Sequence, residues 1–96
     1  MKYQSIADVR QDIDRLDSQL VRLLAERQIC VQAAAGFKTD PGLIPAPERV
    51  AAVIDRIKVL AEQQGLSVTV AERVWREMIS SFIALEKEFH QQTARS

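Results

Sequence analysis

The chain has 96 residues, of which 47% are hydrophobic and 27% are charged. Thirteen basic residues balance thirteen acidic ones, which excludes the broad positive field that nucleic acid or an anionic membrane surface requires. The N-terminus lacks the apolar stretch of a secretory signal, and no run approaches the roughly twenty apolar residues of a membrane span. We therefore expect a single soluble domain over residues 1–96, located in the cytoplasm.

The first predicted element is a long helix from Ile6 to Phe37, with Ser5 as its cap and Asp8 in its first turn. About 33 residues at 1.5 Å each give a rod of roughly 50 Å, whereas a monomer of this size has a radius of gyration near 13 Å. The helix should therefore bury its apolar face against a second copy of the chain in an intertwined homodimer. This face repeats at alternating spacings of three and four, as in a heptad: Ile6, Val9, Ile13, Leu16, Leu20, Leu23, Arg27, Cys30, Ala34 and Phe37.

A loop and two shorter helices complete the predicted all-α fold. The segment TDPGLIPA at 39–46 contains a Pro-Gly pair and a second proline, which predicts a loop beside Lys38 and a candidate lid. A second helix begins near Pro47 and stops at Gly65, and a third runs from a Thr69/Glu72 capping box to about Thr93. The inward positions are Val50, Val53, Ile54, Ile57 and Leu60, then Trp75, Met78, Ile79, Phe82, Ile83, Glu86 and Phe89.

Two cations on the first helix form the candidate binding site. Arg27 occupies a heptad position that its neighbours fill with apolar residues, and a buried guanidinium needs an anionic partner. Lys38 follows after eleven residues, so a continuous helix would point both cations the same way, about 16 Å apart, to bracket a small dianion. The alternative interpretation is that Arg27 pairs with a core carboxylate and Lys38 is an exposed cation at a helix end.

Three further charged residues are weaker candidates. Arg10 lies about 25 Å from Arg27 along the helix, so the two converge on one ligand only from different chains; otherwise Arg10 is an ordinary surface arginine. Glu86 lies on the inward stripe of the third helix, where burial favours a neutral carboxyl group that donates a hydrogen bond, unless it pairs with Arg27 or Lys38. Glu48 is either a ligand or a dipole-favoured start of the second helix.

Other kinds of catalytic site have no support in the sequence. The single histidine, His90, has no serine, cysteine or aspartate arrangement around it that would indicate nucleophilic catalysis. Cys30 has no partner for an internal disulfide and none at metal-ligand spacing, and we interpret it as a small core residue rather than a reactive thiol. We expect no metal site, no glycine-rich phosphate loop and no cofactor.

In their order and spacing, these motifs match a known family over essentially the whole chain. They are VRQDIDRLD with Arg10, LLAERQ with Arg27, the FK pair ending in Lys38, IPAPERVAA with Glu48, and the spacing to Glu86. The chain resembles the all-helical chorismate mutases and their relatives, the isochorismate-pyruvate lyases. The resemblance implies an intertwined dimer of three-helix subunits with two shared active sites and a small-molecule substrate, chorismate or isochorismate.

Carried over by position, the resemblance assigns a role to each candidate. Arg27 and the partner's Arg10 would hold the substrate's two carboxylates, and Lys38 a carboxylate and the enolpyruvyl ether oxygen. Glu48 would contact the ring hydroxyl, and Glu86 would approach the ether oxygen from the other side.

Three positions depart from the mutase pattern. Pro47 replaces an arginine and Phe82 a serine, and both changes favour the lyase. Glu86 replaces the glutamine common to both branches, and a glutamate donates a hydrogen bond only when protonated. Our first hypothesis is a chorismate mutase, the second an isochorismate-pyruvate lyase, and the third a helical dimer module without catalytic activity.

Overall fold

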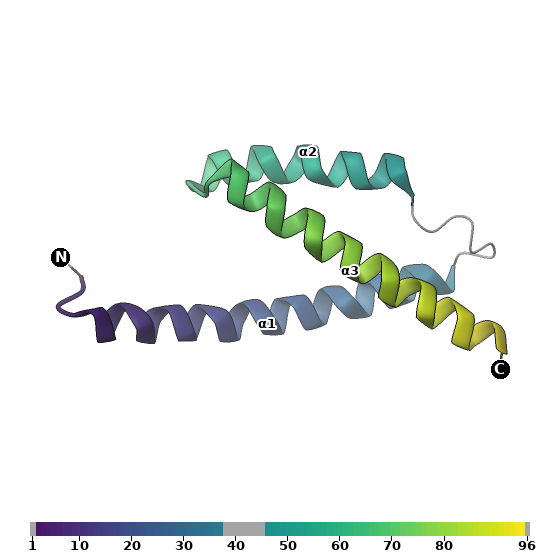
Figure 1. Ribbon diagram of the computed structural model, residues 1–96, viewed down its shortest axis with the longest axis horizontal. Coiled ribbons are helices and arrows are strands. Elements are labelled where there is room, and N and C mark those ends of the chain that lie inside the picture. Colours follow the sequence, from purple (N-terminus) through teal and green to yellow (C-terminus); the bar gives the residue numbers. More distant parts are fainter. Residues whose placement is uncertain (1, 38–45, 96) are drawn as a thin grey trace. The chain divides into compact units, whose positions relative to one another are not determined.

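The computed structural model describes residues 2–37 and 46–95, with side chains as far as residue 89. Its helices are α1 (Ile6–Gly36), α2 (Pro47–Gln64) and α3 (Val68–Arg95) (Figure 1). Since these described ranges contain no strand, the predicted all-α class with three helices is confirmed. The chain comprises two compact units, Met1–Cys30 and Val31–Ser96.

Helix α1 is one unbroken element of 31 residues. Ser5 caps it as predicted, because its Oγ atom accepts a hydrogen bond from the backbone N–H of Asp8 at 3.2 Å. The helix ends at Gly36, one residue before the predicted end, and the N–H of Phe37 donates to the carbonyl of Ala34 at 3.1 Å in a final tighter turn. The heptad pattern therefore gave both ends of α1 to within one residue.

Most of the apolar seam of α1 is exposed in the single chain. Cys30 is also exposed, so the expectation of a buried core residue does not hold within one chain. Five large members of the seam are between 47% and 62% exposed: Ile6, Ile13, Leu16, Leu20 and Leu23.

Helix α2 begins and ends where the sequence predicts. Pro47 stands in its first turn, where the missing N–H leaves no hydrogen bond unmade. Gly65 follows the last turn with φ 74°, a left-handed conformation that glycine adopts without a steric penalty. The N–H groups of Gly65 and Leu66 donate to the carbonyls of Glu62 and Ala61 at 3.3 and 2.8 Å, so the helix end is satisfied.

Helix α3 begins at Val68, capped by Ser67 rather than by Thr69. The Oγ atom of Ser67 accepts from the N–H of Val70 at 3.3 Å, so the predicted Thr69/Glu72 capping box is wrong. The carboxylate of Glu72 instead binds Lys58 of α2 at 3.2 Å and Arg76 of α3 at 2.8 Å. Glu72 therefore joins two helices instead of closing one helix end.

The two shorter helices pack against each other and share a core. Figure 1 shows α3 diverging from α2 with distance from the turn at Gly65. Ile57 and Ala61 of α2 meet Ala71 of α3 next to that turn, so small side chains sit where the helices lie closest. All twelve predicted inward positions are buried or partly buried, among them Ile54, Ile79 and Glu86.

Candidate active site

Arg27 differs from its neighbours on α1 by being partly buried. The seam leucines one and two turns before it, Leu23 and Leu20, are 52% and 55% exposed. The side chain of Arg27 is withdrawn further from solvent, and its Nη1 atom is buried. A guanidinium keeps its charge even when buried, so it makes a fixed positive centre for a carboxylate.

Glu86 is the one buried charged side chain among the described residues, at 6% exposure. It lies on the stripe of α3 that also carries Ile79, which is buried, and Phe82 and Phe89, which are partly buried. The predicted inward position of Glu86 is therefore confirmed.

Arg10 and Glu48 are both exposed. Arg10 lies in the second turn of α1, and the helix runs unbroken from it to Arg27, so about 25 Å separates the two residues along the axis. One chain cannot bring both arginines to the same small molecule. Glu48 stands in the first turn of α2, where a carboxylate favours the helix N-terminus, and Ala46 provides no side-chain cap.

Lys38 lies outside the described residues, as does nearly all of the predicted lid, residues 39–45. Of the other candidates, Arg10 and Arg27 lie in the unit Met1–Cys30, and Glu48 and Glu86 lie in the unit Val31–Ser96.

Across the described part of the chain, no group of three or more histidine, cysteine, aspartate or glutamate side chains could hold a metal ion. Nor is any helix in that part long and apolar enough to cross a membrane.

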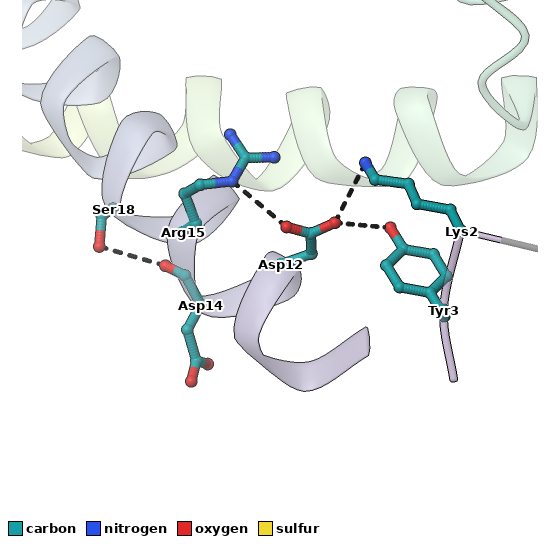
Figure 2. A network of polar contacts seen from close by, with 6 residues as sticks. All are labelled: Lys2, Tyr3, Asp12, Asp14, Arg15 and Ser18. Atoms are coloured by element: carbon teal, nitrogen blue, oxygen red, sulfur yellow. Dashed lines mark hydrogen bonds and ion pairs between the residues drawn. The ribbon is translucent and has the colours of Figure 1, made fainter. Parts of the chain in front are cut away.

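A polar cluster at the start of α1 was not predicted. Asp12 accepts a hydrogen bond from Tyr3 Oη at 2.8 Å and forms ion pairs with Lys2 at 3.3 Å and Arg15 at 3.4 Å (Figure 2). The hydrogen bond from Tyr3, followed by Lys2, lowers the pKa of Asp12, and the same hydrogen bond raises the pKa of Tyr3. The spacing of Asp12 and Arg15 is a sequence signal for a helix pair, whereas nothing in the sequence signals the contact with Tyr3.

A groove of about 450 Å³ between α2 and α3 was also not predicted. Val50, Ile54 and Ile83 give it an apolar floor, and the cations Lys58 and Arg76 line it as well. Both cations already bind Glu72, which lowers the pKa of that carboxyl group, with the hydrogen bond from Arg76 the larger cause. This one carboxylate offsets about half of the positive charge of Lys58 and Arg76.

Comparison with known proteins gives a family match across most of the chain. The pattern of the family described as chorismate mutase type II matches residues 9–87. This range includes Arg10, Arg27, Lys38, Glu48 and Glu86.

Individual relatives include both a lyase and a mutase. An isochorismate pyruvate lyase from Pseudomonas aeruginosa is 39% identical over 88 residues, which cover 92% of this chain and 87% of the lyase. A chorismate mutase from Methanocaldococcus jannaschii is 28% identical over 91 residues, which cover 94% of this chain and 92% of the mutase. The T-protein of Haemophilus influenzae is 34% identical over 94 residues, 97% of this chain but only 25% of that protein.

Proposed function

The chain belongs to the chorismate mutase type II family, and from this premise we propose that it is a chorismate mutase, which converts chorismate to prephenate. The observation that carries the proposal is the family match over residues 9–87, with the cations and carboxyl groups of the candidate site inside it. A module that only packed helices would gain stability by replacing Arg27 with leucine, because burial of a guanidinium is costly.

The proposed active unit is a homodimer. The exposed seam of α1 supports it, because Ile13, Leu16 and Leu20 would lose unfavourable contact with water against a second chain. The separation of Arg10 and Arg27 on one unbroken helix supports it independently. If both arginines bind one substrate, Arg10 must come from the partner subunit.

In this proposal each residue contacts a particular group of the substrate. Arg27 and Arg10 of the partner subunit bind the two carboxylates, and Glu48 contacts the ring hydroxyl. Lys38 binds a carboxylate and the ether oxygen, and Glu86 donates to the same ether oxygen from the other side. Bidentate guanidinium contacts suit carboxylates, since they fix both position and orientation.

The reaction is a Claisen rearrangement within one molecule. The ether carbon-oxygen bond breaks while a carbon-carbon bond forms between the enolpyruvyl methylene and the ring, and no proton or electron is exchanged with the protein. The protein holds the enolpyruvyl arm over the ring in the reactive conformer. Lys38 and Glu86 stabilise the negative charge that grows on the ether oxygen as the bond lengthens.

Glu86 can serve this role only as a neutral acid, since an ionised carboxylate has no proton to donate. Its side chain is 6% exposed and is therefore shielded from bulk water. We propose that the protonated form is the one that acts, and replacement of Glu86 by glutamine tests this role.

An isochorismate-pyruvate lyase is the second candidate, and specific observations favour it. Pro47 and Phe82 replace the arginine and serine of the mutases, and the lyase from P. aeruginosa is 39% identical. That reaction breaks the same ether bond but transfers a ring hydrogen to the enolpyruvyl methylene, giving salicylate and pyruvate. The same cations would serve it.

The discriminating experiment is to incubate the purified protein separately with chorismate and isochorismate and to measure prephenate and salicylate at pH 5 and pH 7.5. We expect prephenate from chorismate as the faster reaction. A preference for isochorismate would assign the lyase activity instead. Inactivity on both substrates would contradict an enzymatic role and favour a helical module without catalytic activity.

A further inference from the structure

The segment before α1 folds back along the first turns of that helix. Tyr3 Oη donates to Asp12 Oδ2 at 2.8 Å, and Lys2 Nζ lies 3.3 Å from the same oxygen. Arg15 Nε contacts the other carboxylate oxygen, Oδ1, at 3.4 Å from the next turn (Figure 2). We refer to Lys2, Tyr3, Asp12 and Arg15 as the Asp12 cluster.

A second set of contacts fixes the same segment to the first turn. The N–H of Gln4 donates to Asp8 Oδ2 at 3.1 Å, and the N–H of Asp8 donates to Ser5 Oγ at 3.2 Å. Among residues 6–26, only Asp8, Val9 and Asp12 are not exposed, so the segment covers one side of this stretch. Helix α1 thus has local tertiary cover at its first two turns, on the side of Asp8, Val9 and Asp12.

Arg10 lies inside the segment of chain that this cluster closes. Tyr3 precedes it by seven residues and Asp12 follows it by two, and these are the two ends of the shortest contact in the cluster. Helix ends fray because their first N–H groups lack partners within the helix. Unwinding the turn that carries Arg10 would require breaking both the Ser5 cap and the hydrogen bond from Tyr3 to Asp12.

We propose that the Asp12 cluster is a positioning element for Arg10, which holds the first two turns of α1 in helical form so that the guanidinium meets the substrate carboxylate in one place. The inference rests on the proposed function, in which Arg10 serves the active site of the other subunit. Tyr3 is its central residue, because its hydroxyl makes the shortest contact between the preceding segment and the helix, 2.8 Å to Asp12, against 3.3 Å for Lys2.

The hydrogen bond between Tyr3 and Asp12 persists at neutral pH. Asp12 is ionised and Tyr3 keeps its proton at neutral pH, because their hydrogen bond lowers the pKa of the acid and raises that of the phenol. The position of the Arg10 guanidinium matters because it binds a substrate carboxylate in the proposed site. A small displacement of the guanidinium would weaken the binding of the substrate.

The test is a double-mutant cycle between Tyr3→Phe and Arg10→Ala. Tyr3→Phe keeps the ring but removes the hydroxyl, and we expect KM to rise about three- to fivefold with kcat changed less than twofold. In the Arg10→Ala background the same change should leave the residual kcat/KM, measured at high enzyme concentration, unaltered, because there is no guanidinium to position. The matched control is Ser18→Ala, which removes a side-chain hydrogen bond to the Asp14 carbonyl further along α1 and should leave KM unchanged.

Equal effects of Tyr3→Phe in both backgrounds, or no effect in either, would overturn the proposal even if the enzyme is fully active. A second measurement is independent of catalysis. Hydrogen exchange of the backbone amides at 9–11 should be about threefold faster in Tyr3→Phe than in the unaltered protein, with the thermal midpoint unchanged. Unchanged exchange would overturn the proposal, whereas inactivity of the unaltered protein on both substrates would overturn the proposed function.

Discussion

Helix α1 and the pair of helices α2 and α3 are built from similar side chains but bury them differently. The pair has a core of its own around Ile57, Ala61 and Ala71. Helix α1 carries an equally regular apolar seam, yet in the single chain Leu20 remains 55% exposed. The pair is thus stabilised within the single chain, whereas the seam of α1 is the surface that we propose to contact a second chain.

The charged groups follow the same division. The pair holds two of its cations in internal ion pairs, since Glu72 binds both Lys58 and Arg76. Helix α1 carries Arg10 exposed and Arg27 partly buried, on positions too far apart to act together within one chain. The comparison teaches that similarly regular sequence patterns can specify internal packing in one region and leave an exposed apolar face in another.

The largest expected effect separates a cation of the site from a cation of the packed pair. Lys38→Ala should lower kcat/KM by about a thousandfold or more, because it removes the charge that stabilises the developing oxyanion. Lys58→Ala is the matched control and should remain within about twofold, since Lys58 binds Glu72. Steady-state kinetics measure kcat/KM of both variants, and circular dichroism checks their helix content. Retention of most activity in Lys38→Ala would show that Lys38 does not stabilise the ether oxygen.

The next effect tests the seam itself. Leu20 of α1 and Val59 of α2 are 55% and 54% exposed in the single chain, so exposure alone does not distinguish them. Leu20→Glu should weaken dimerisation about a hundredfold, because it places an unpaired charge in the proposed subunit interface, whereas Val59→Glu should not change it. Sedimentation equilibrium measures the dissociation constants, and equal constants for the two variants would refute the seam as the interface.

A smaller effect concerns the buried carboxyl group of α3. Glu86→Gln should move the activity optimum toward neutral pH and raise the rate at pH 7.5 about tenfold relative to the rate at pH 5, because an amide donates at every pH. The pH profile of kcat/KM tests this. An unchanged profile would show that Glu86 does not act as a neutral donor.

The smallest effect lies within the packed pair. The pKa of Glu72 is lowered from its ordinary value of 4.5, so its contribution to stability is complete above about that pH and is lost as the pH falls through the lowered value. Glu72→Gln should lower the urea midpoint at pH 7 by about 0.2–0.4 M, with the difference vanishing in acid. The control is Glu77→Gln, which replaces an exposed glutamate of the same helix. If the urea midpoint of Glu72→Gln stayed below that of the unaltered protein in acid, the ion pairs of Glu72 would not be the cause of the lower stability.

The sequence predicted what depends on local periodicity and on special residues. Ser5, Pro47 and Gly65 mark helix ends by their own chemistry, and the inward position of Glu86 follows from its spacing after Ile79 and Phe82. Each of these signals acts within a few residues along the chain. The structure agrees with all of them.

Features set by contacts between distant residues were not predictable in this way. Thr69 and Glu72 fit a capping box, but Lys58 of another helix competes for the carboxylate and Ser67 becomes the cap. The hydrogen bond from Tyr3 to Asp12 joins an irregular segment to a helix, which no periodicity encodes. The roles of Arg10, Lys38 and Glu48 come from the family resemblance, because their spacing alone is equally consistent with solvated surface charges.

The central claim is that each active site combines Arg27 of one subunit with Arg10 of the other, and a complementation measurement tests it most directly. Arg10→Ala and Arg27→Ala should each be nearly inactive alone. When the two variants are unfolded together, refolded and assayed, half of the dimers are mixed and each mixed dimer has one intact site, so activity should recover to about a quarter of the unaltered enzyme. Activity that stays at the level of the separate variants would contradict a site shared between subunits.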